Sequence, residues 1–114
     1  MEPSKYAKTR LAATIHLGVA EARMFDTVKA IKDASAELHL GVSLKSCTYI
    51  CNGIFEDGIE IGLLDYPGGP GLTLNTILGL AKRLLEPAGQ RAASVTCRIM
   101  PTYLISAEDD QWQY

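Results

Sequence analysis

The chain has 114 residues, and its 13 acidic side chains against 11 basic ones give a net charge of −2. This length suits one globular domain and leaves little room for a second one. Because 47% of the residues are hydrophobic and only 21% are charged, intrinsic disorder is excluded for most of the chain. A dedicated nucleic-acid binder is normally strongly basic, so the net charge argues against nucleic-acid partners.

The chain-wide pattern predicts a single domain over residues 1–114. We expect a polar tail at residues 1–8, an α+β core at 9–106 and an acidic tail at 107–114. The core begins with a strand whose apolar side chains alternate with Thr14, His16 and Gly18. These apolar positions are Leu11, Ala13, Ile15, Leu17 and Val19.

A helix is predicted next, over Glu21–Leu38, because the apolar period changes from two to between three and four residues. Its expected buried face consists of Met24, Val28, Ile31, Ser35 and Leu38. Gly41 is expected to end the helix, because glycine accepts a positive φ. His39, near that end, is interpreted as a capping or surface residue.

The middle of the chain predicts two strands, Leu44–Phe55 and Ile59–Tyr66. Two turn signals compete for the hairpin between them, Glu56-Asp57-Gly58 and Asn52-Gly53. We favour Glu56-Asp57-Gly58 as the turn, because an earlier turn would leave an Asp-Gly break inside the second of these strands. Asn52-Gly53 is then interpreted as a β-bulge.

The clearest helix follows the loop Pro67-Gly68-Gly69-Pro70-Gly71. Its apolar side chains recur at helical spacing, at Leu74, Ile77, Leu78, Ala81, Leu84 and Leu85. Thr73 is the expected N-cap, and Pro87 with Gly89 is expected to end the helix. Anion binding at the loop is disfavoured, because its two prolines lack the N–H donors that a phosphate needs.

A fourth strand is predicted at Ala92–Met100, and Tyr103–Ile105 could add a short fifth one. The element order is therefore β-α-β-β-α-β, with amphipathic helices and strands that each have one apolar face. Such elements form two layers, a sheet covered by both helices on one face. We predict the ferredoxin-like sandwich, with an antiparallel four-stranded sheet in the order 4-1-3-2.

This fold leaves the second sheet face open, and the candidate ligand-binding residues lie there. His16, Glu60 and Arg98 are expected to form a row across neighbouring strands, joined by Tyr49 or Ile50 according to register. A carboxylate beside an imidazole can orient it and favour its charged form, which would create an acid–base centre. The alternative interpretation is a charge-paired surface covered by another subunit.

Three cysteines, Cys47, Cys51 and Cys97, indicate packed, reduced thiols rather than a disulfide framework. The apolar stretch Leu11–Ala20 follows basic residues, as in a secretion signal, but polar residues interrupt it. No apolar run reaches the ~20 residues that span a bilayer. We therefore expect a cytoplasmic protein without a membrane partner.

The acidic residues lack the spacing of a calcium loop, so neither a metal site nor a cofactor is predicted. These residues are Asp65, Glu108, Asp109 and Asp110. The Gly53–Gly58 segment before a strand, and Gly89-Gln90 before the last strand, resemble small ferredoxin-like orphan proteins of mobile elements, such as phage or integron gene cassettes. That resemblance implies no defined activity.

The leading hypothesis is a non-enzymatic module that self-associates, as a homodimer, through its open sheet face or an edge strand, or that binds a partner through the open face. Leu64, Tyr66 and Met100 would otherwise expose an apolar patch there. The alternative is a small-molecule-binding protein, or a small acid–base enzyme, with a site around His16 and Glu60 together with Arg98. The sequence assigns no catalytic residue.

Overall fold

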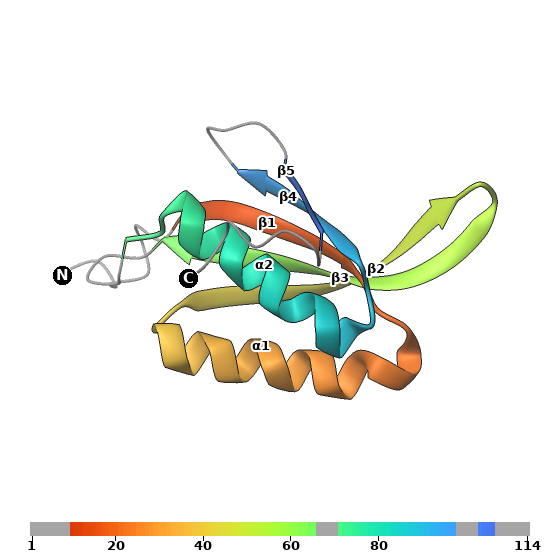
Figure 1. Ribbon diagram of the computed structural model, residues 1–114, viewed down its shortest axis with the longest axis horizontal. Coiled ribbons are helices and arrows are strands. Elements are labelled where there is room, and N and C mark those ends of the chain that lie inside the picture. The colour runs from red at the N-terminus through yellow and green to blue at the C-terminus, as the bar shows by residue number, and fades with distance from the viewer. Residues whose placement is uncertain (1–9, 66–70, 98–102, 107–114) are drawn as a thin grey trace, which may run out of the picture.

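The computed structural model of the protein describes residues 10–65, 71–97 and 103–106. In chain order they form β1 (Arg10–Gly18), a short 3₁₀ turn η2 (Glu21–Arg23), α1 (Met24–Leu38), β2 (Gly41–Cys51), β3 (Ile54–Asp65), α2 (Leu74–Ala88), β4 (Ala92–Cys97) and β5 (Tyr103–Ser106). The strands build an antiparallel sheet in the order β2-β3-β1-β4-β5, and both α-helices lie on one side of it (Figure 1).

The predicted fold class is confirmed. Read from β4 to β2, the sheet has the order 4-1-3-2, and it forms a two-layer α+β fold with the two helices. β5 extends the sheet at the outer edge of β4. Within the described residues, no helix is long and apolar enough to cross a membrane.

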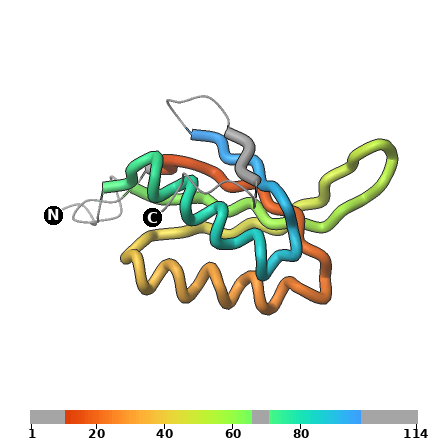
Figure 2. The backbone as a smooth tube through the Cα atoms, viewed as in Figure 1, coloured from red at the N-terminus to blue at the C-terminus, as the bar shows by residue number. Residues whose placement is uncertain are grey.

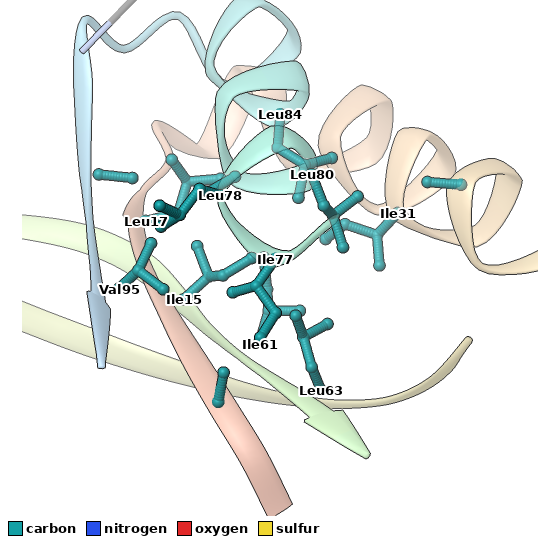
Figure 3. Packing of buried hydrophobic residues seen from close by; sticks show 14 of the residues in the cluster. Ile15, Leu17, Ile31, Ile61, Leu63, Ile77, Leu78, Leu80, Leu84 and Val95 are labelled. Atoms are coloured by element: carbon teal, nitrogen blue, oxygen red, sulfur yellow. The ribbon is translucent and has the colours of Figure 1, made fainter. Parts of the chain in front are cut away.

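Aliphatic side chains of the sheet and of α2 fill the space between the two layers (Figure 3). Because alternate residues of a strand face opposite sides, β1 and β3 each contribute every second side chain. The residues labelled in Figure 3 are Ile15, Leu17, Ile31, Ile61, Leu63, Ile77, Leu78, Leu80, Leu84 and Val95. This packing fixes which face of each strand remains open.

Helix α1 buries less than its periodicity predicted. Its buried residues are Thr27, Ile31 and Ala34, whereas Val28 is 36% exposed. The helix packs mainly along α2, at the margin of the sheet, so only a narrow stripe faces the core (Figure 1). Thr27 tolerates full burial because its hydroxyl donates a hydrogen bond to the Arg23 carbonyl at 2.7 Å.

The predicted helix ends are partly right. Thr73 is the N-cap of α2, since its hydroxyl oxygen accepts from the Thr76 amide at 3.1 Å. Gly89 is the C-cap at φ 70°, although Pro87 lies inside the last turn. At the end of α1, His39 itself adopts the left-handed conformation at φ 56°, and Gly41 begins β2 instead of ending the helix.

The predicted hairpin turn is wrong. Asn52 and Gly53 form the turn, with φ of 52° and 79°, and β2 pairs with β3 up to Cys51 opposite Ile54. Positive φ at both central residues matches the twist of a two-residue hairpin, which Asn-Gly provides. Gly58 instead lies within β3, opposite Cys47.

The β2–β3 hairpin extends beyond the rest of the sheet, as Figures 1 and 2 show. β1 pairs with β3 only as far as Gly58, so residues 48–57 form a two-stranded projection, here called the hairpin arm. Ile50 and Phe55 face each other on the arm and are 64% and 72% exposed. The arm therefore depends on its base for its position.

Two leucines provide a matched test of the core. Leu84 is fully buried, whereas Leu44 is 46% exposed on the edge strand β2. We expect Leu84→Ala to lower the free energy of unfolding by about 3 kcal/mol, because the truncation leaves a cavity. Leu44→Ala should cost less than about 1 kcal/mol. Urea denaturation measures both, and equal losses would contradict this packing.

Candidate functional site

The row across the open face begins with His16 and Glu60. They are direct partners in the β1–β3 register, and His16 Nδ1 lies 3.7 Å from Glu60 Oε1. Their side chains are 30% and 34% exposed, so a ligand on this face can reach both. Lys45 of β2 is paired with Glu60, and Ser94 of β4 is paired with His16.

Arg98, the third residue expected in this row, lies outside the described residues. The register of β4 nevertheless gives the position opposite His16 to Ser94. The strands thus bring together the predicted His16–Glu60 pair, which follows from β1 and β3 being neighbours. Of the two residues expected to join this pair according to register, the observed register puts Tyr49 rather than Ile50 on this face.

Tyr49 lies on the same face, with its ring over Gly58. A side chain at Gly58 would collide with that ring, so the glycine creates the space that the ring fills. The Tyr49 hydroxyl is buried and has no hydrogen-bond partner among the described residues. Burial raises the pKa of Tyr49, and the nearby Cys47, Glu60 and Glu56 raise this pKa further. The phenol therefore stays protonated.

Glu56 is a site residue that sequence reasoning missed. It pairs with Tyr49 across the hairpin, and its carboxylate reaches over Gly18 of β1. Gln90 Nε2 donates a hydrogen bond to Glu56 Oε1 at 3.1 Å. The signal was the two-residue spacing from Glu56 through Gly58 to Glu60, which the wrong turn assignment concealed.

These groups share the open face: the Tyr49 ring lies over Gly58, the Glu56 carboxylate lies over the paired Gly18, and Glu60 follows two residues after Gly58 in β3. An aromatic ring flanked by two carboxylates attracts a cation, through charge and through the ring's negative face. No group of three His, Cys, Asp or Glu in the described part of the chain is arranged to hold a metal ion.

A hollow of about 210 Å³ adjoins the row on the open face. Thr14 and Thr96, which are paired across β1 and β4, contribute hydroxyl-bearing side chains to its lining. Leu11 lies beside them and reaches over Gly62. The open face thus combines the charged His16–Glu60 pair with a mostly apolar recess, whose Thr14–Thr96 pair lies two residues along the strands from His16 and Ser94.

The cysteines only partly follow the predicted packing role. Cys97 is buried, and this burial raises the pKa of its thiol. Cys47 is half-buried beside Tyr49, whereas Cys51 is exposed near the tip of the arm. All three are free thiols.

Comparisons with known proteins identify shared architecture rather than shared sequence. The sequence matches no protein-family model and no curated protein. Among solved structures, a phage SAM lyase in its apo state aligns with a TM-score of 0.62 and 17% identity, over 97% of this chain and 100% of that chain. A phage SAM lyase in complex with S-methyl-5'-thioadenosine aligns with a TM-score of 0.55 and 20% identity, over 89% and 92% of the two chains. The fold is shared with these enzymes.

These structures overturn the leading functional prediction. The neighbours are enzymes, which contradicts a non-enzymatic module that self-associates through its open face. The expected likeness to orphan proteins without a defined activity is also wrong, because the structural neighbours are enzymes. Neither the structure nor these neighbours supports the predicted homodimer or the predicted cytoplasmic location. Of the residues expected to form an apolar patch on the open face, Leu64 is half-buried, and Tyr66 and Met100 lie outside the described residues. The alternative of a small-molecule-binding protein or small enzyme fits better.

The contact between Tyr49 and Gly58 can be tested by filling the glycine's space. We expect Gly58→Ala to destabilise the fold by about 2 kcal/mol, because the added methyl group displaces the Tyr49 ring or shifts the backbone. Gly53→Ala is the control: its surroundings are open, so only its positive φ resists the change, at about 1 kcal/mol. Thermal and urea unfolding compare them, and a ring that keeps its NMR shifts in Gly58→Ala would refute the contact.

Because the pKa of Tyr49 is raised in the folded state, the free energy of unfolding changes with pH in the alkaline range. Its folded-state pKa lies above the unfolded value of about 10, so the stabilisation is complete below that value and is lost as pH rises. We expect the free energy of unfolding to fall above pH about 10. Tyr49→Phe, which keeps the ring, should reduce that fall. Urea melts from pH 8 to 11 measure it, and identical profiles would exclude a buried phenol.

Proposed function

We propose that the protein is a lyase that cleaves S-adenosylmethionine to S-methyl-5'-thioadenosine on its open face. The observation that carries this proposal is the Tyr49 ring over Gly58, with Glu56 and Glu60 two residues before and after that glycine in β3 and both close enough to raise the pKa of the tyrosine. S-adenosylmethionine is a sulfonium cation, and a neutral phenol ring near two carboxylates suits such a charge. The shared fold of the phage SAM lyases supports the same substrate.

The charge of the site also distinguishes substrate from product. When the bond between sulfur and the four-carbon amino-acid portion breaks, the sulfur becomes a neutral thioether. Glu56 and Glu60 then lose their attraction for it, so the product leaves more readily than the substrate. The adjoining recess by Thr14 and Thr96 offers apolar and hydroxyl-bearing surface for the uncharged part of the ligand.

Glu60 is the central residue of this proposal. It lies between His16 and Lys45 in the sheet, and its Oε1 is 3.7 Å from His16 Nδ1. We assign Glu60 to contact the substrate's cationic portion and His16 to position Glu60. As a lyase, the protein adds no water. The substrate's own carboxylate attacks the carbon bonded to sulfur, the carbon–sulfur bond breaks with both electrons passing to sulfur, and the four-carbon portion leaves as a lactone.

The activity is tested by incubating the purified protein with S-adenosylmethionine and separating the products by chromatography. We expect S-methyl-5'-thioadenosine to accumulate, and Glu60→Gln to lower kcat/KM about 100-fold, which corresponds to about 2.7 kcal/mol of transition-state binding. Glu86→Gln, a change at an exposed residue of α2, is the matched control and should leave the rate unchanged. No product from the wild-type protein, or equal rates in both variants, would overturn the proposal.

A further inference from the structure

Gln90 occupies a rigid position immediately after α2. The helix ends at Gly89 in the left-handed conformation, with the Gly89 amide donating to the Glu86 carbonyl at 3.0 Å. The Gln90 amide donates to the Leu85 carbonyl at 2.9 Å, so the chain is fixed as it leaves the helix. α2 is also the most deeply buried helix described. Gln90 is therefore anchored to the core.

The side chain of Gln90 reaches from this anchor to the hairpin arm. Its Nε2 donates to Glu56 Oε1 at 3.1 Å, and the contact spans the surface of Gly18. A Cβ at Gly18 would collide with the Glu56 carboxylate and crowd the Gln90 amide. The absence of a side chain at this position therefore keeps the path between the two residues open.

Glu56 needs a hydrogen-bond donor to fix its side chain, because it lies on the hairpin arm. Residues 48–57 do not pair with β1, and an exposed Glu side chain has several accessible rotamers. Near this point the arm is tied to the body by the Val19 amide, which donates to the Asp57 carbonyl at 2.8 Å. That contact fixes the backbone of the arm, whereas the side-chain amide of Gln90 selects one direction for the Glu56 carboxylate.

We infer that Gln90 is a positioning residue, which holds the Glu56 carboxylate beside Tyr49 for recognition of the substrate's cation. This inference rests on the proposed function. The donor is a neutral amide, so it orients Glu56 without neutralising it, as an arginine or lysine would. The full negative charge remains available to a sulfonium group.

The test compares two non-cleavable probes by calorimetry. Sinefungin carries an ammonium group where the substrate carries its sulfonium, and S-adenosylhomocysteine carries a neutral thioether there. We expect the wild-type protein to prefer sinefungin. Gln90→Leu and Glu56→Gln should each reduce that preference, by about threefold and about tenfold respectively, because a misplaced or absent carboxylate discriminates charge less well.

A double variant that exchanges the amide and the carboxylate shows whether Gln90 orients Glu56 for the ligand or only stabilises the hairpin arm. In the double variant E56Q/Q90E, the amide and the carboxylate trade places, so the hydrogen bond can form in the opposite direction. We expect its melting temperature to return toward the wild-type value while the preference for sinefungin stays reduced. A restored preference, or an undiminished one in Gln90→Leu, would overturn the role of Gln90 alone. A wild-type protein that binds neither probe, or binds both equally, would overturn the proposed function as well.

Discussion

The antiparallel register between β1 and β3 is the constraint on which the rest of the structure depends. It sets Ile15 against Ile61 on the helix side and His16 against Glu60 on the open side. Because successive side chains of a strand point to opposite faces, a slip of one residue would expose the core and bury the charges together. The packing of α2 against the sheet therefore stabilises the core and, through the register, the arrangement of the candidate site.

Sequence periodicity was sufficient for the elements whose residues face one continuous core. The two-residue period of β1 predicted its buried face, and the helical spacing after Thr73 predicted α2. The hairpin turn was missed because Asn52-Gly53 and Asp57-Gly58 carry similar local signals. The strand pairing distinguishes them: with Cys51 opposite Ile54, Gly58 lies inside β3 and the Tyr49 ring packs over it, a contact that no local pattern reveals.

The same contact explains how much of the candidate site was predictable. His16 and Glu60 could be paired because their strands were correctly placed as neighbours. Glu56 was assigned to a turn, so its side chain had no predicted face. Its hydrogen bond to Gln90 joins residues 34 positions apart, and no local pattern indicates such a contact. A site formed at the base of a projecting hairpin thus depends on its turn being placed correctly.

The composition of the core bears on how this fold persists among sequences that differ widely. The buried hydrophobic side chains of the described residues are aliphatic, with Cys97 as the exception and no aromatic ring among them. Isoleucine, leucine and valine can replace one another with small volume changes when neighbours compensate. Such an interior can exchange most of its residues over evolutionary time while the backbone stays recognisable, so common ancestry would leave its trace in shape long after it has faded from the amino-acid sequence.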